Sequence, residues 1–247
     1  MVLPYAFPVV AVLGLLFLYS RHDDSTSPVV TNMIVHDGLK YSAPFAESPP
    51  RVKVTVYLEA LCIDSKRFVL DQLVPTFDLL GPSVIDLDIV PFGNAKLVEH
   101  DNDSETKGNV ICQHGNAECD ANVYELCATS LYQGNPSRYL PFLACLFATL
   151  PMRRQETLLD TSLFAACARH AAIEFSDSLA KHCHDDPARA WQLQVDANRR
   201  TPPHDHVPWV VFNDGPHTMD EFHDSLLEVV CLVYENGGVS HPVCSNL

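Results

Sequence analysis

Hydrophobic and polar positions alternate soon after residue 50, in a pattern that predicts a strand. Apolar side chains occupy every second position from Val52 to Leu58, the period of two that is typical of a β-strand. Cys62 follows directly. Apolar residues from Phe68 to Phe77 then recur at helical spacing, so a helix is predicted to begin near Cys62. Pro75 lies inside this pattern and is expected to kink or end the helix.

A second strand is predicted at residues 85–89, where Ile85, Leu87 and Ile89 alternate with two aspartates. The order strand, helix, strand is the start of a parallel α/β sheet.

The character of the chain changes from Asn94 to about residue 198. Residues 94–111 are polar and are interpreted as a loop. Helix-like patterns with regularly spread cysteines follow, which predicts a largely helical insertion, about 94–198, held by disulfides. The cysteines of this stretch are Cys112, Cys119, Cys127, Cys145, Cys167 and Cys183.

The C-terminal part predicts a strand and a helix. Residues 207–212 form a short apolar run that contains Pro208, and the turn residues 213–215 leave room for only a brief hairpin partner. Apolar residues from Met219 to Val233 then recur at intervals of three or four, which predicts an amphipathic helix facing the core. A tail, 237–247, follows the predicted main domain, 51–236.

The N-terminus predicts a targeting segment. Residues 2–19 carry no charge, and polar residues end the apolar run. A signal peptide, 1–27, is the main interpretation, followed by a flexible leader, 28–50. An uncleaved membrane anchor is the alternative, because the run approaches the ~20 residues that span a bilayer. Either segment directs the chain into the secretory pathway, where a sequon at Asn102 predicts a glycosylation site.

Composition excludes several classes of function. Acidic residues outnumber basic ones 31 to 16, for a net charge of −15. Such a surface repels phosphate backbones and anionic lipid headgroups, so neither nucleic acid nor a membrane surface is an expected partner. The nine cysteines form an odd number, which in an oxidising compartment predicts pairs plus one left over.

Cys62 is the candidate for the unpaired thiol. At a strand-to-helix junction, helix N–H groups favour an anion. A free thiol has a pKa of about 8.5, and this position can lower it. The resulting thiolate attacks disulfides. The alternative is that Cys62 is half of a structural disulfide. The eight other cysteines could form four disulfides in 105 ways, so no pairing follows from the sequence.

Three stretches of the sequence resemble the gamma-interferon-inducible lysosomal thiol reductases and their secreted relatives. The first runs from Tyr57 through Cys62 to Phe68. The second, residues 112–119, fits the family signature C-Q-H-G-x-x-E-C, and the third is residues 203–210 with Asn213. The signature positions, interpreted as structural, are Cys112, Gln113, His114, Gly115, Glu118 and Cys119.

The resemblance implies an α/β, thioredoxin-like fold with a disulfide-rich helical insertion. It also implies a cis proline at Pro208 facing Cys62, with Val207 and Pro208 presenting backbone to the substrate. This sequence departs from the many members with C-x-x-C, because Ser65 stands where they have a second, resolving cysteine. The Ser65 hydroxyl can instead hydrogen-bond the Cys62 thiolate or cap the helix.

The expected function is thiol–disulfide oxidoreduction of protein disulfides through the single nucleophile Cys62. Release of product then needs an external thiol and no bound cofactor. The expected location is lysosomal or extracellular. The alternative is a non-catalytic secreted glycoprotein that keeps the fold and binds or traps protein partners. No metal site is expected, because the pairs His182/His184 and His204/His206 lack a third zinc ligand at convincing spacing.

Overall fold

The fold is described from a computed structural model that covers residues 34–36, 39–41, 50–98, 108–215, 218–219 and 224–247. The chain divides into two units, residues 1–47 and 48–247. In the first, β1 (Ile34–His36) pairs antiparallel with β2 (Leu39–Tyr41). The predicted signal segment, most of the predicted leader and Asn102 lie outside the described residues.

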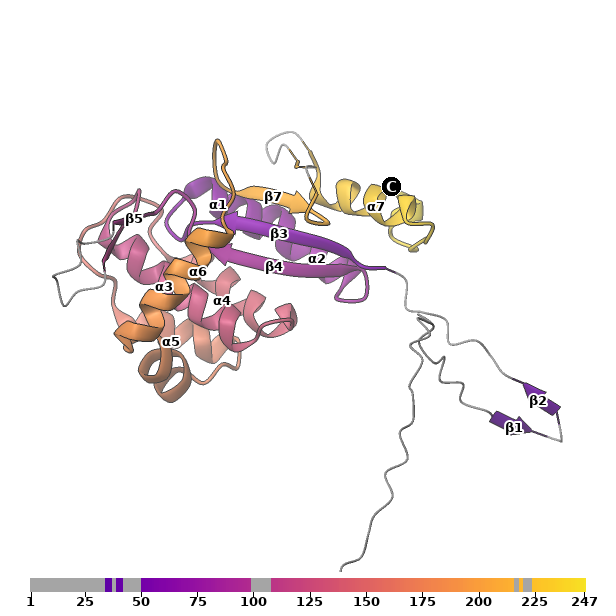
Figure 1. Ribbon diagram of the computed structural model, residues 1–247, viewed down its shortest axis with the longest axis horizontal. Helices are drawn as coiled ribbons and strands as arrows, with labels where there is room; N and C mark the ends of the chain where they lie inside the picture. Colours follow the sequence, from indigo (N-terminus) through magenta and orange to yellow (C-terminus); the bar gives the residue numbers. More distant parts are fainter. Residues whose placement is uncertain (1–33, 37–38, 42–49, 99–107, 216–217, 220–223) are drawn as a thin grey trace, which may run out of the picture. The chain divides into compact units, whose positions relative to one another are not determined.

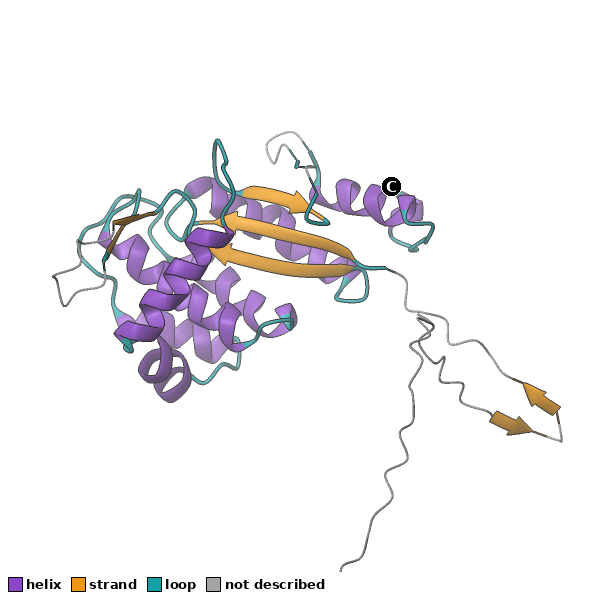
Figure 2. Cartoon of the chain, viewed as in Figure 1, coloured by secondary structure: helices purple, strands orange, loops and turns teal. Residues whose placement is uncertain are grey.

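The second unit is built on a three-stranded sheet of order β4-β3-β7 (Figures 1 and 2). The central strand β3 (Val52–Leu58) runs parallel to β4 (Ile85–Pro91) and antiparallel to β7 (Trp209–Phe212). The alternating apolar side chains of β3 are buried, as the period-two pattern requires. The predicted parallel pair of strands is confirmed.

A continuous helical segment links β3 to β4 and passes behind the sheet in Figure 1. It consists of α1 (Ile63–Arg67), a wider-turned helix η1 (Phe68–Leu73) and α2 (Val74–Leu80). The amide of Val74 donates to the carbonyl of Val69, five residues back. Pro75 has no N–H to donate and follows directly after these wide turns. The proline therefore coincides with a change of helical winding but does not end the helix.

The insertion follows β4 and gathers at the end of the sheet where β3 and β4 finish (Figure 1). Two short strands pair antiparallel, β5 (Lys96–Val98) and β6 (Asn109–Ile111). The prediction of a plain loop over residues 94–111 was therefore wrong at its two ends, where strands of three residues are too short to show a period. The remaining elements are helices: α3 (Asn116–Leu131), α4 (Pro136–Thr149), α5 (Thr161–His170), η2 (Phe175–His184) and α6 (Pro187–Arg200).

Four disulfides tie the second unit, and Cys62 is the free thiol. One closes the signature loop, two join helices of the insertion, and one fastens the C-terminal segment. The pairs are Cys112–Cys119, Cys127–Cys183, Cys145–Cys167 and Cys231–Cys244. The expectation of paired cysteines with one left over is confirmed, and the pairing itself comes from the structure.

The C-terminal segment returns to the sheet. In the described part of this segment, one bridge joins Val211 of β7 to Thr218, in agreement with the brief hairpin partner that was predicted. Helix α7 (Leu226–Asn236) begins later than its apolar pattern suggested, because the Ser225 side chain accepts a hydrogen bond from the amide of Glu228 and caps it there. The chain ends in the short helix η3 (Cys244–Asn246).

The sheet and the insertion share one hydrophobic core. Its largest side chains include Phe142, Phe147 and Phe164 of the insertion and Phe212 of β7, none more than 2% exposed. The Tyr139 hydroxyl donates a hydrogen bond to a carbonyl of β4 at 3.0 Å. The insertion is thus part of the scaffold that holds the ends of β3 and β4. Among the described residues, no helix combines the length and the apolar character needed to cross a bilayer.

Candidate active site

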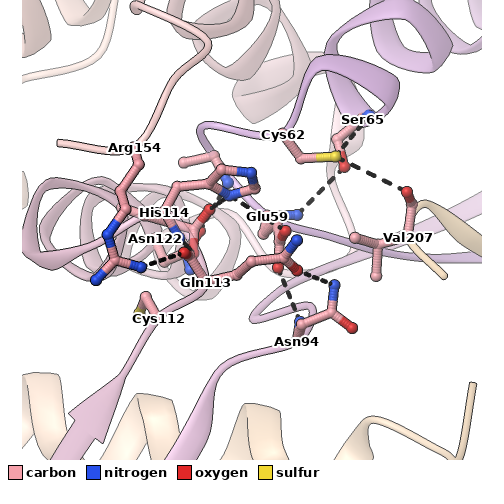
Figure 3. A network of polar contacts seen from close by, with 12 residues as sticks. Glu59, Cys62, Ser65, Asn94, Cys112, Gln113, His114, Asn122, Arg154 and Val207 are labelled. Atoms are coloured by element: carbon pink, nitrogen blue, oxygen red, sulfur yellow. Dashed lines mark hydrogen bonds and ion pairs between the residues drawn. The ribbon is translucent and has the colours of Figure 1, made fainter.

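Cys62 lies where β3 gives way to α1, in the first turn of backbone beyond the sheet. It is the N-cap of α1, and its Sγ accepts a hydrogen bond from the amide of Ser65 at 3.5 Å. The Sγ also donates to the carbonyl oxygen of Val207 at 3.8 Å (Figure 3). Cys62 is 8% exposed. The thiol therefore sits between a helix N-terminus and a backbone carbonyl from a distant part of the chain.

The peptide bond between Val207 and Pro208 is cis, as the resemblance implied. Strand β7 begins at the next residue, Trp209, which pairs with Tyr57 near the end of β3. This antiparallel pairing brings Val207 beside Cys62, 145 residues away along the chain. Sheet register is the physical reason why these residues meet.

Burial raises the pKa of the Cys62 thiol above its ordinary value. The amides of Ser65 and Asp64 and the Ser65 hydroxyl oppose this rise, while the charge of Glu59 adds to it. The helix N-terminus thus acts in the direction that the sequence analysis expected, but desolvation of the thiolate outweighs it. In the free protein the thiol form is favoured.

Ser65 is fully buried in the first turn of α1. Its hydroxyl oxygen accepts a hydrogen bond from the amide of Glu59 at 3.4 Å. The possibility that Ser65 caps the helix was wrong, because Cys62 holds the N-cap position. Ser65 connects the active-site turn to the end of β3.

Glu59 is a buried acid that the sequence analysis did not single out. It is 0% exposed, and its Oε2 accepts a hydrogen bond from the amide of Asn94 at 2.8 Å. Its Oε1 lies 3.4 Å from Nδ1 of His114. Burial and the charge of Glu118 raise the pKa of Glu59 to about 7, against the pull of the Asn94 amide and His114. Glu59 therefore exchanges its proton near neutral pH.

The signature loop leads into α3 and carries the partner groups of Glu59 (Figure 3). Gly115 has φ +88°, and a side chain there would meet the carbonyl of Gln155 at 2.6 Å, so the glycine is needed for conformation and for space. The His114 amide donates to one Glu118 oxygen at 3.1 Å, and its Nδ1 contacts the other. Gln113 accepts a hydrogen bond from the Asn94 side chain at 2.7 Å.

Helix α3 directs a stripe of polar side chains into the core. Glu118, Asn122 and Glu125 are buried and lie four and then three residues apart, the spacing of one helix face. Asn122 Oδ1 accepts a hydrogen bond from the amide of Ala60 at 2.9 Å. Both oxygens of Glu125 lack hydrogen-bond partners, and burial followed by the charge of Glu118 raises its pKa well above the ordinary value. The spacing was visible in the sequence, but nothing there showed that this face was buried.

Three side chains of the site have the atom types of metal ligands. Glu59, His114 and Glu118 each offer one ligand atom, and these atoms lie within 4.8 Å of one another. His114 contacts a Glu118 oxygen and the Asn94 amide donates to Glu59 Oε2, while Glu59 Oε1 has no hydrogen-bond partner among the described residues.

The histidines that suggested zinc have other contacts. His184 lies 2.8 Å from Asp120 and 2.7 Å from Asp185 through its two ring nitrogens. Burial acts to lower the pKa of His184, but its hydrogen bonds and the charges of the two aspartates raise it overall. The ring nitrogens of His204 lie 2.8 Å from the Pro202 carbonyl and 3.2 Å from Asn94.

Comparison with known proteins identifies the family. A family model described as gamma interferon inducible lysosomal thiol reductase (GILT) matches residues 53–171. A gamma-interferon-inducible lysosomal thiol reductase from Carassius auratus is 30% identical over 206 residues, which cover 80% of this chain and 73% of the relative. A gamma-interferon-responsive lysosomal thiol protein from Arabidopsis thaliana is 30% identical over 200 residues, 79% of this chain and 76% of that one. The chain belongs to the GILT family.

Solved structures of two bacterial proteins share the fold of this GILT family member. Oxidised BdbD from Bacillus subtilis matches with a TM-score of 0.52 and 17% identity, over 78% of this chain and 89% of the other. Reduced DsbA from Mycobacterium tuberculosis matches with a TM-score of 0.54 and 13% identity, over 88% and 94%. The predicted thioredoxin-like fold with a helical insertion is confirmed.

Family and geometry together support thiol–disulfide oxidoreductase chemistry for this GILT family member. The four disulfides also fit folding in an oxidising compartment of the secretory pathway.

Proposed function

We propose that the protein is a monothiol thiol–disulfide oxidoreductase that acts on protein disulfides. The observation that carries this proposal is the free Cys62 at the start of α1, within 3.8 Å of the carbonyl of Val207 beside the cis bond to Pro208. The other cysteines are paired, so Cys62 is the available nucleophile.

The first step is attack of the Cys62 thiolate on one sulfur of a substrate disulfide. A bond forms between Cys62 Sγ and that sulfur, and the second substrate sulfur leaves as a thiolate. The thiol proton must first leave Cys62, which burial disfavours. Binding of a substrate chain along the Val207–Pro208 backbone would replace the contact between Sγ and the Val207 carbonyl.

Release of the mixed disulfide requires a thiol from outside the site. Ser65 has no redox chemistry, so it cannot displace the substrate as a second cysteine would. A first external thiolate attacks Cys62 Sγ and frees the substrate as a dithiol, and a second regenerates Cys62. In total, two external thiols are oxidised to one disulfide and the substrate disulfide is reduced.

A second candidate function follows from the same substitution. With a buried Ser65 in place of the resolving thiol, a mixed disulfide on Cys62 persists wherever external thiol is scarce. The protein would then capture a partner covalently and not turn over. For both candidates we propose disulfide-containing proteins as partners, an external thiol in place of a bound cofactor, and a lysosomal or extracellular location.

Reduction of insulin with excess external thiol, at pH 5 and pH 7, tests the proposal. Wild type should accelerate the reaction catalytically, and Cys62→Ala should reduce the rate to the background of the external thiol. Stoichiometric trapping without turnover, seen by mass spectrometry of the mixed disulfide, would favour the second candidate. Equal background rates from both chains, with no mixed disulfide on Cys62 detected by mass spectrometry, would reject both.

Restoring the second thiol refines the test. Ser65→Cys should raise turnover at limiting external thiol about tenfold or more, because an intramolecular thiol has a high effective concentration. Ser65→Ala is the matched control, since it removes the hydroxyl without adding a sulfur. If Ser65→Cys behaves like Ser65→Ala, the missing thiol is not what limits this site.

A further inference from the structure

A groove of about 820 Å³ lies beside the site, next to the signature loop. Its walls come from the segment after β4, from the signature loop and from residues 201–204. The volume falls within the ~300–1,000 Å³ typical of small-ligand sites. The groove has no part in the steps described above.

The charge of the groove is opposite to that of the chain as a whole. Lys96, Arg154 and His204 line it, and no aspartate or glutamate does so among the described residues. The chain carries a net charge of −15, so a lining of this sign is not what a random part of the surface would show. Clefts lined by one sign of charge concentrate ligands of the opposite sign.

Donors remain available for an anion in the groove. Lys96 is exposed, and its side chain has no hydrogen bond or ion pair with the described residues. Arg154 donates to the Gln113 carbonyl at 2.9 Å and pairs with Glu156 at 2.8 Å, which leaves some of its five N–H donors free. The nearby acid Glu59 does not line the groove. It lies beneath Gly93, where an added side chain would meet the Glu59 carboxylate.

Two features connect residues that line the groove to the active site. Asn94 donates from its amide to Glu59, and its side chain contacts both Gln113 and His204. Figure 3 shows the Gln113 and Asn94 side chains lying between Arg154 and Val207. Val207 lies three positions after His204, and three residues of extended chain span at most about 10 Å. A bound molecule of tripeptide length can therefore reach from the groove toward Cys62.

We infer that this groove binds the external thiol, as a small peptide-like thiol that carries carboxylates, of which glutathione is the test case. This inference rests on the proposed function, which requires such a thiol. Lys96 and Arg154 hold the carboxylates, and the thiolate attacks Cys62 Sγ in the mixed disulfide. The new bond joins the two sulfurs, the bond from Cys62 to the substrate breaks, and the substrate sulfur leaves as a thiolate.

Kinetics with two thiols test the inference. Insulin reduction is measured as a function of glutathione and, separately, of 2-mercaptoethanol, which has no carboxylate. Losing a charge-assisted hydrogen bond is worth about tenfold in affinity. The double variant Lys96→Gln/Arg154→Gln should therefore raise the ratio of the KM for glutathione to the KM for 2-mercaptoethanol about tenfold or more. The matched control Arg169→Gln/Lys181→Gln, on exposed parts of the insertion, should leave this ratio unchanged.

A binding measurement separates the inference from the proposed function. S-methylglutathione cannot react, so its binding is measured by calorimetry whether or not the protein turns over. Wild type should bind it, added salt should weaken the binding, and Lys96→Gln/Arg154→Gln should weaken it about tenfold. Absent binding together with an unchanged KM ratio would overturn the inference while leaving turnover intact. A double variant that raises only the KM for insulin would also overturn it, and would assign the groove to the protein substrate.

Discussion

The raised pKa of Glu59 makes a measurable prediction about stability. Replacing this carboxyl by an amide, Glu59→Gln, keeps the size and an oxygen for the Asn94 amide but removes the titration. In the folded chain the pKa of Glu59 is about 7, compared with an ordinary value of 4.5. A raised carboxyl pKa means that the folded state holds its proton where the unfolded chain has lost it. The contribution of Glu59 to stability is therefore greatest below pH 4.5. It falls as pH rises through 4.5 to 7, and so lowers the free energy of unfolding over that interval.

The size of the effect follows from the two pKa values. Between pH 5 and pH 7.5, the titration of Glu59 lowers the free energy of unfolding by about 2 kcal/mol. Glu59→Gln lacks this loss. The variant should therefore gain about 2 kcal/mol relative to its parent over that interval, which corresponds to roughly 5 °C in Tm for a unit of this size.

Guanidinium unfolding, followed by the fluorescence of Trp191 and Trp209 at several pH values, measures the effect. Both chains should carry Cys62→Ala, so that the free thiol does not exchange with the disulfides at the higher pH. The titration of Glu125 is common to both chains and cancels in the comparison to first order. Parallel curves of unfolding free energy against pH for the two chains would show that Glu59 does not titrate as described.

Three further predictions concern other parts of the fold. Gly93→Ala should lower the free energy of chemical unfolding by about 1–3 kcal/mol more than Gly81→Ala does. Both glycines have positive φ, but only an added side chain at position 93 meets Glu59. Equal losses in the two variants would contradict this. His184→Gln should destabilise the chain by about 1–2 kcal/mol at pH 5 and by less at pH 8. The reason is that a raised histidine pKa stabilises the fold below pH 6.5, and this stabilisation is lost as pH rises. Thermal unfolding at the two pH values measures the difference, and an equal loss at both would contradict it. Phe164→Ala, at a fully buried position, should cost about 3–5 kcal/mol, and a Tm shift below 2 °C would show that the insertion does not share the core.

The pattern of the sequence was sufficient for the elements that carry the site. Period-two alternation predicted β3 and β4, and the junction after β3 predicted that Cys62 begins a helix. These predictions depend on local spacing, which a strand or helix expresses directly along the chain. The signature residues 112–119 identified the family for the same reason, since they lie together in one loop.

Only the tertiary structure determined how the site is assembled and charged. Whether Glu59 and Glu118 meet depends on how α3 packs on the end of β3, and the pKa of each buried group depends on desolvation that no local pattern records. The sequence suggested a lowered pKa for Cys62, but burial beneath Val207 reverses the direction. Disulfide pairing and the basic groove likewise depend on contacts between distant segments. The sequence by itself therefore determined the main strands and helices, the family and the candidate nucleophile, whereas packing decided the surroundings that set their chemistry.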